Sequence, residues 1–173
     1  MIGFINRCIK KEDGSTAIEF SLLMMPYMLI SLAIIEVSLM FMSASLLEGA
    51  TDSAARLIRT GQVQQTAGDP ETMFRNALCS YAVVLIDCNT MVIEVTTLTN
   101  YADYTAPTYD AGGNMVTSGF DAGGSNDKVL IRVAYSYSMM TPLVGTLLNG
   151  SDGATLFVST IVLQTEPYEF QGA

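Results

Sequence analysis

The sequence predicts an α+β protein: a long N-terminal membrane helix, pilin-like in layout, continues into a small head with a short helix and a roughly three-stranded antiparallel sheet. Three observations predict this fold class. An almost uncharged apolar run fills residues 20–47, a helical spacing of apolar residues follows it, and three later segments alternate with a period of two. We expect a helix over 15–61 and an extracytoplasmic α+β head domain over 62–173.

Composition excludes several classes of protein. Half of the 173 residues are hydrophobic and 14% are charged, which is not the composition of a disordered chain. The net charge of −9 argues against nucleic-acid binding, which needs a basic surface. The chain has no His, which removes Ser–His and Cys–His catalytic pairs and most catalytic zinc sites. We therefore expect no enzyme, no cofactor, no metal and no nucleic-acid partner.

The apolar run is long enough to cross a membrane as one helix. Between residues 20 and 47 the single charged residue is Glu36, and a bilayer core needs about 20 apolar residues. Arg7, Lys10 and Lys11 precede the run, and positive flanks stay in the cytoplasm. We expect a single-pass protein of the inner (cytoplasmic) membrane, with its N-terminus inside and its head outside.

A secretory signal peptide is the alternative interpretation of this run. Such a peptide has an apolar core of about 7–15 residues before a small-residue cleavage site, and residues 43–45 offer such a site. Two features favour the span: the apolar stretch is longer, and Glu19 lies just inside its start.

A short motif stands at the entrance to the predicted span. Four residues separate Gly14 from Glu19, and the aromatic Phe20 follows directly. This motif resembles the cleavage signal of type IV pilin precursors. Together with Pro26 inside the span, Glu36 in mid-helix and an Ala/Arg-rich continuation, the first 60 residues resemble the TadE family, minor pseudopilins of the Tad (Flp-type) tight-adherence pilus. The remaining residues match that family only in layout.

The resemblance implies a processing site and an assembly contact. A prepilin peptidase would remove the leader peptide 1–14 by cutting after Gly14, so that Ser15 becomes the new N-terminus. Glu19 would then pair with the amino terminus of a neighbouring subunit, whereas the alternative is a Glu19 that is merely hydrated at the cytoplasmic interface. The implied partners are the prepilin peptidase, other Tad pilins and pseudopilins, the inner-membrane assembly platform and the lipid bilayer. The implied role is pilus assembly or initiation, and hence adhesion, with the protein in the membrane or at the end of the extracellular pilus.

Two residues inside the span have structural consequences. Pro26 lacks an amide hydrogen, so we expect it to kink the helix. Glu36 lies at the outer interface if the span begins near Ser15, but it is buried and needs a partner subunit if the span is centred near residue 32. The apolar segment 37–42 leaves both positions open.

The helix is expected to continue past the membrane to about Thr60 and to stop at Gly61. Apolar or small residues recur at steps of three and four, forming a stripe that the head must cover. The members of this stripe are Leu47, Ala50, Ala54, Leu57 and Gly61.

A second, short helix is predicted from residue 70 to about 85. Asp69 is a capping residue, Pro70 suits the first helical position, and Glu71 suits the first turn. Cys79 and Cys88 are nine residues apart in a domain that we place in an oxidising compartment, so we expect a disulfide. Two free buried thiols are the alternative.

Three strands are predicted at 91–98, 129–138 and 156–161, with a turn at 148–153. The apolar connection 139–148 either packs under the sheet or contacts a partner. The long loop 100–126 contains two Asp-Ala-Gly-Gly turns around a short ribbon at 115–120. Its carboxylates and amides either cap plain turns or bind calcium; the oxygen donors are Asp121, Asn126 and Asp127.

Three functional classes remain open. The first is a minor pilin processed at Gly14. The second is a single-pass, membrane-anchored extracytoplasmic binding or sensor module that is not cleaved. The third is a secreted domain that ordinary signal peptidase releases near residue 45.

Overall fold

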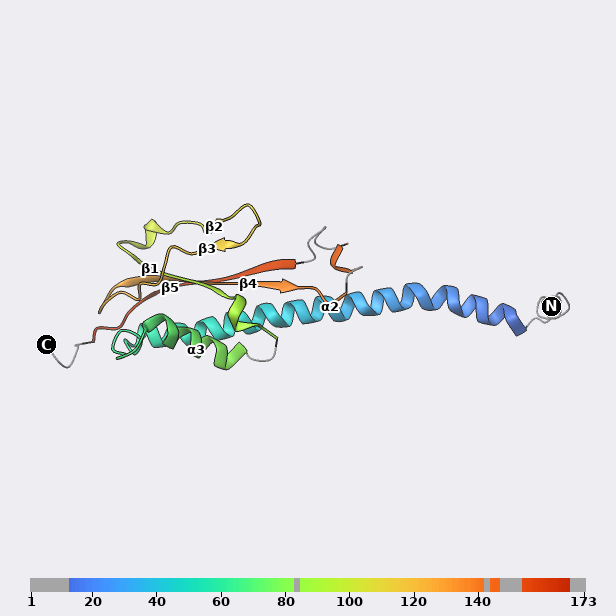
Figure 1. Cartoon of the computed structure of the whole chain (residues 1–173), viewed down its shortest axis with the longest axis horizontal. Helices are drawn as coiled ribbons and strands as arrows, with labels where there is room; N and C mark the ends of the chain where they lie inside the picture. Colours follow the sequence, from blue (N-terminus) through green and yellow to red (C-terminus); the bar gives the residue numbers. More distant parts are fainter. Residues whose placement is uncertain (1–12, 83–84, 142–143, 147–153, 169–173) are drawn as a thin grey trace.

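The computed structural model describes residues 13–82, 85–141, 144–146 and 154–168, and its α+β architecture confirms the predicted fold class (Figure 1). A long helix carries a small head that contains a short helix and a three-stranded antiparallel sheet. The elements are α2 (Asp13–Arg59), α3 (Pro70–Ala82), β1 (Val92–Leu98), β2 (Thr108–Tyr109), β3 (Met115–Val116), β4 (Lys128–Ser138) and β5 (Ala154–Gln164), with 3-10 turns η1 (Cys88–Thr90) and η2 (Tyr101–Asp103).

Helix α2 is a single rod of 47 residues, about 70 Å long at 1.5 Å per residue. Its C-terminal half lies along the sheet, and its N-terminal part projects beyond the head (Figure 1). The helix continues through Pro26, and the predicted kink stays a prediction.

The C-terminus of α2 is closed by Gly61, as the sequence predicts. Gly61 has a φ of 77°, its amide donates to the carbonyl of Ile58, and the next amide, that of Gln62, donates to the carbonyl of Leu57. This pair of bonds is the Schellman arrangement that satisfies the last helical carbonyls.

The head-facing stripe of α2 differs by one position from the predicted one. Leu47, Ala50 and Ala54 are buried as expected, but the next fully buried side chain is Ile58. Leu57 is half-buried at the edge of the core. The reason is helical geometry: at 3.6 residues per turn, a step of four from Ala54 stays on the stripe, and the predicted step of three rotates away from it.

The sheet has the strand order β1-β4-β5 with both pairs antiparallel. Alternate residues of β4 face the helices and form the core with α2 and α3; they are Val129, Ile131, Val133, Tyr135 and Tyr137. In Figure 1 the β2–β3 ribbon lies above the sheet, and the helices lie below it. Strand β1 begins one residue later than the predicted strand 91–98, β4 contains the predicted strand 129–138, and β5 extends the predicted strand 156–161 at both ends.

Helix α3 packs beside α2 and is fastened at both ends. Asp69 caps its start, because the amide of Thr72 donates to the Asp69 carboxylate at 2.9 Å. Near its end, Cys79 and Cys88 form the predicted disulfide. The described part of the helix ends at Ala82 rather than near 85, and residues 83–84 lie outside the described residues.

The loop between β1 and β4 covers the face of the sheet that points away from the helices. Its ribbon pairs β2 with β3 around the turn at 110–114. The ribbon therefore begins earlier than the predicted 115–120, at Thr108, and its second strand starts at Met115. Phe120 instead bridges to Val95 beside β1. The predicted turn at 148–153 lies outside the described residues.

A buried ion pair holds this loop to the sheet. Arg132 on β4 and Glu94 on β1 are paired neighbours, 2% and 6% exposed, and their side chains meet at 2.9 Å. The Glu94 carboxylate also accepts hydrogen bonds from the amide and hydroxyl of Ser118. Arg132 donates to the carbonyl of Thr105 and lies over the ring of Tyr104. The pair therefore anchors both ends of the loop.

Candidate functional site

The part of α2 that projects from the head is an exposed apolar surface. Within the described residues, one helix is long and apolar enough to cross a membrane, and only 11% of its most apolar window is buried. A core helix of a soluble protein would be mostly buried. At about 1.5 Å per residue, 20 residues of this segment are about 30 Å long, which equals the thickness of a bilayer core. Its most exposed large side chains include Ile18, Phe20, Leu22, Leu23, Met25, Tyr27, Ile30 and Ile34.

The predicted processing residues lie at the far end of this segment. Gly14 and Ser15 are in the first turn of α2, and the side chains of Glu19 and Phe20 are exposed in the next turn. These residues belong to the N-terminal end of α2, which lies away from the head (Figure 1). Most of the predicted leader lies outside the described residues.

Glu36 marks the point at which α2 enters the head. Its side chain is 2% exposed, and each carboxylate oxygen accepts two hydrogen bonds from the head. Oε1 accepts from the Tyr137 hydroxyl at 3.2 Å and from the Met140 amide at 3.0 Å. Oε2 accepts from the amide and the hydroxyl of Thr141 at 3.1 and 3.0 Å. These four donors replace the water that an exposed carboxylate would bind.

This arrangement corrects the sequence-based expectation for Glu36. Neither hydration at the outer interface nor a partner subunit is needed, because the head of the same chain supplies the donors. Extending the stripe from Leu47 back through the buried Ser43 leads, one helical repeat of seven earlier, to Glu36. That periodicity is the signal in the sequence that indicates a head-facing Glu36.

The junction also settles the start of the connection 139–148. Residues 139–141 leave β4 and cross α2 at Glu36, where two backbone amides are fixed by the carboxylate. The connection therefore packs on the helix of its own chain at this point. Residues 142–143 and 147–148 lie outside the described residues.

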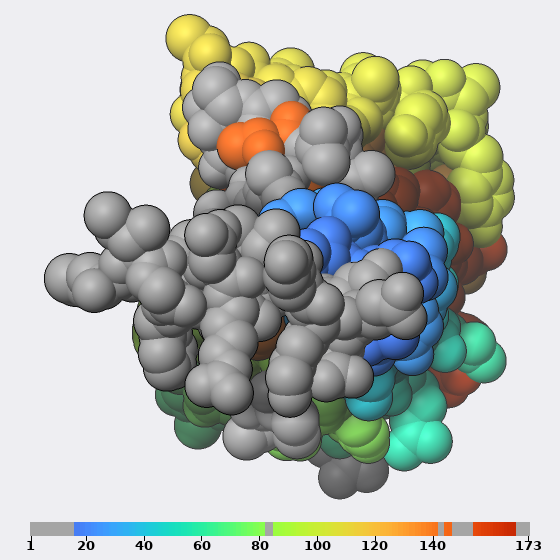
Figure 2. Space-filling view, turned by 90° about the vertical axis from the view of Figure 1, so that its right-hand side faces the viewer, coloured from blue at the N-terminus to red at the C-terminus, as the bar shows by residue number. Residues whose placement is uncertain are grey.

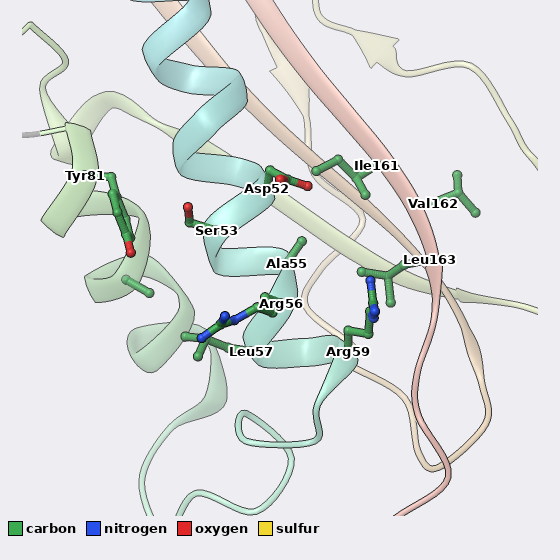
Figure 3. Close-up of a pocket in the computed structure, with 11 residues that line it drawn as sticks. Asp52, Ser53, Ala55, Arg56, Leu57, Arg59, Tyr81, Ile161, Val162 and Leu163 are labelled. Atoms are coloured by element: carbon green, nitrogen blue, oxygen red, sulfur yellow. The ribbon is translucent and has the colours of Figure 1, made fainter.

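A cleft of about 650 Å³ opens on the outer side of α2, between α3 and β5 (Figure 3). In Figure 3, Arg56 and Arg59 lie toward its lower end, and Tyr81 lies across it on α3. Arg59 pairs with Glu166 at 3.4 Å, with both side chains more than half exposed. The cleft is lined by Asp52, Ser53, Ala55, Arg56, Leu57, Arg59, Ala77, Tyr81, Ile161, Val162 and Leu163. The lining mixes charged, polar and apolar side chains.

The carboxylates that the sequence offered for calcium cap turns. Asp121 accepts hydrogen bonds from the Gly123 amide and the Thr97 hydroxyl, and Asp127 accepts one from the Gly124 amide. The part of the chain that the structure describes contains no group of three or more His, Cys, Asp or Glu arranged to hold a metal ion.

Comparison with known proteins gives a match for the N-terminal helix. No curated protein and no solved structure matched the chain. The model of the TadE family, described as "TadE-like protein", matches residues 14–56. The match covers the projecting segment, the Glu36 junction and most of the head-facing stripe, and it associates the chain with the pilin-like proteins of Tad pili. Over these residues, the N-terminal helix of this chain is similar to the TadE-like family.

Proposed function

We propose that the protein is a minor pilin or pseudopilin of a Tad (Flp-type) type IV pilus and acts in pilus assembly or initiation. One observation carries the proposal: an exposed apolar helical segment about 30 Å long projects from a folded head, inside the TadE-like match. The role is structural, and adhesion follows from the pilus that it helps to build.

In this proposal α2 has two successive environments. It first spans the inner membrane, with the basic flank of Arg7, Lys10 and Lys11 in the cytoplasm and the head outside. It then exchanges lipid for the N-terminal helices of other pilins, brought together by the assembly platform. A helix that is apolar on all sides suits both environments, because lipid tails and packed helices are similarly apolar.

Glu19 provides the register in the assembled helices. A carboxylate in hydrocarbon costs about 2.5–3.5 kcal/mol on insertion scales and needs a partner. Cleavage after Gly14 by the prepilin peptidase makes Ser15 the first residue, and its new ammonium group is the partner that the neighbouring subunit supplies.

Sequencing the amino terminus of the membrane-extracted protein tests the processing step. We expect Ser15 as the first residue in cells with the prepilin peptidase and Met1 in cells without it. A start at Met1 in both strains supports an uncleaved, membrane-anchored binding module, a role to which the exposed Tyr101 and Tyr109 are suited. A start near residue 45 means a secreted domain. Either result contradicts the proposal.

The variant Glu19→Ala tests the assembly contact separately from processing. We expect normal removal of the leader and a loss of piliated cells, because an unpaired ammonium group is left among apolar helices. Glu48→Gln is the matched control, since Glu48 is an exposed carboxylate on the same helix beside the head. Normal piliation with Glu19→Ala would show that Glu19 is only hydrated.

A further inference from the structure

The apolar surface of α2 does not end where the helix meets the head. Beyond Glu36, the side chains of Phe41 and Met42 are 64% and 53% exposed, and Met140 of the head is 71% exposed. We call these three residues the base collar. Figure 2 views the molecule toward the N-terminal end of α2, and described residues that follow β4 (orange) lie above the blue helix at this end of the head.

The collar spans a short length of the helix. The amide of Met140 donates to Glu36 at 3.0 Å, which holds its backbone against α2 at Glu36. Phe41 and Met42 are five and six residues farther along, or about 8–9 Å at 1.5 Å per residue. The collar therefore occupies a narrow band at the base of the head.

The length of the helix places this band at a membrane boundary. Glu19 is the last charged residue before the apolar run, and a bilayer core about 30 Å thick that begins after it ends near Leu39. Glu36 and Met140 then lie at the outer margin of the hydrocarbon, and Phe41 and Met42 lie among the headgroups.

The scarcity of charged residues in this part of the chain also fits a position at the membrane boundary. Apart from Glu36, no residue in 20–47 is charged, and the sequence 133–151 carries no charge. The carboxylate of Glu36 is withdrawn from the surface by its four donors. The described surface of this band therefore presents apolar side chains, which are costly to leave in water, together with hydroxyl groups, which the polar headgroups of a lipid surface accept.

We propose that the base collar contacts the lipid bilayer at the boundary between the acyl chains and headgroups of the leaflet on the head's side. The head then rests directly on the membrane, and Glu36 is shielded from lipid by its own head. This inference rests on the proposed membrane span of α2 and adds to it a second, peripheral contact made by the folded head.

The absence of Trp from the chain allows a direct test of depth. Single-Trp variants Phe41→Trp and Met140→Trp of the full-length protein are reconstituted into phosphatidylcholine vesicles that contain lipids brominated near the headgroup or near the chain end. Ile30→Trp reports on the span, and Tyr81→Trp, at an exposed site on α3, reports on the side of the head. All four sites are exposed, so the replacements leave the core unchanged.

We expect headgroup-proximal bromine to quench Phe41→Trp and Met140→Trp, and deep bromine to quench Ile30→Trp. Tyr81→Trp should keep its emission with both lipids. Ile30→Trp could be quenched while the two collar variants lose no more emission than Tyr81→Trp. The head would then lie away from the membrane, so the inference would be wrong although the proposed span would be supported. If Ile30→Trp is not quenched, the proposed span itself fails. A third outcome is that Phe41→Trp and Met140→Trp resist quenching but their emission shifts to the blue as the protein concentration rises. This result would mean that a second copy of the protein covers the base collar, and it also overturns the inference.

Discussion

At the residue scale, two buried carboxylates hold together parts of the chain that are far apart in sequence. Glu36 binds the start of the connection after β4, and Glu94 binds the long loop that follows β1. Glu36 does so through neutral donors, whereas Glu94 also meets a cation, Arg132. A carboxylate buried in this way stabilises the fold only while all of its donors are in place, because each unsatisfied polar group costs free energy.

The variant Glu36→Gln tests the junction. The Gln amide group replaces an acceptor oxygen with a donor, so two of the four donors lose their acceptor. We expect faster hydrogen exchange at the Met140 and Thr141 amides and a free energy of unfolding lower by about 1–3 kcal/mol. Exchange is measured by mass spectrometry on the full-length protein in detergent micelles, with Glu48→Gln as the control. Unchanged protection in Glu36→Gln would mean that these amides are held by other groups.

Glu94 predicts a dependence of stability on pH. Burial acts to raise the pKa of Glu94, but hydrogen bonds from Ser118 and Arg132 and the charge of Arg132 outweigh it, so the pKa lies below the ordinary value. A lowered folded-state pKa stabilises the fold above the unfolded-state pKa of about 4.3, and this contribution is lost as the pH falls through the folded-state value. We therefore expect acid to weaken the attachment of the loop.

Glu94→Gln should flatten the acid side of this dependence. It should also lower stability near neutral pH by about 3–5 kcal/mol, because Arg132 stays buried without its charged partner. Thermal unfolding from about pH 3 to pH 7 measures both effects. Part of the dependence of stability on pH will persist in Glu94→Gln, because hydrogen bonds also lower the pKa values of Asp69 and Asp110. An identical slope in Glu94→Gln and the natural protein would show that the ion pair does not link stability to pH.

At the element scale, the two ends of the head-bound half of α2 are set by different interactions. Near residue 36 the helix enters the head through side-chain hydrogen bonds. At Gly61 it stops because the backbone adopts a positive φ and closes the last carbonyls. A second glycine, Gly49, lies within the same helix and is exposed, and no atom outside its chain neighbours and the adjacent helical backbone lies within 4 Å of the position that a Cβ would occupy there. The two glycines therefore have opposite roles.

Gly61→Ala and Gly49→Ala form a matched pair. At Gly61 a methyl group would lie 2.7 Å from the ring of Tyr168, at a φ of 77°, so we expect a loss of stability above about 1 kcal/mol. At Gly49 the same change should stabilise the helix by about 0.5–1 kcal/mol, because Ala has the higher helix propensity. Urea unfolding in detergent compares them. A stabilising Gly61→Ala would contradict the observed closure of the helix.

At the scale of the whole molecule, apolar surface is divided between two tasks. The head buries one stripe of α2 against β4 and β5, and the projecting segment leaves its apolar side chains exposed on all sides. No element of the described head covers that segment, and the proposed function assigns its cover to lipid or to other helices. This division predicts that substitutions in the projecting segment change location without changing the fold of the head.

Met25→Arg tests this division. Met25 is exposed near the middle of the projecting segment, where Arg costs about 2.5–3.5 kcal/mol on insertion scales. We expect less protein to resist alkaline extraction from membranes, while the Cys79–Cys88 disulfide still forms. Glu48→Arg, on the part of α2 beside the head, should stay fully in the membrane. Equal retention of Met25→Arg would place the projecting segment outside the bilayer.

Features that depend on neighbours in sequence were predictable from the sequence alone. The apolar run, the stop at Gly61, the cap at Asp69 and the three strands depend on residue type and short-range spacing. The disulfide followed from two cysteines close in sequence. The TadE-like resemblance lies in the same local segment, which is why a single helix sufficed to reveal it.

The partners of the buried charges were decided only by the tertiary structure. Glu36 and Tyr137 are 101 residues apart, and Glu94 and Arg132 are 38 apart. Whether such groups meet depends on the register of β4 against β1 and on how α2 lies along the sheet, and no local pattern contains this information. The sequence by itself thus determined a membrane-length apolar helix joined to an α+β head; the fold decided that the one charge in the middle of that helix is held by the head itself, because only folding brings four donors to a single carboxylate.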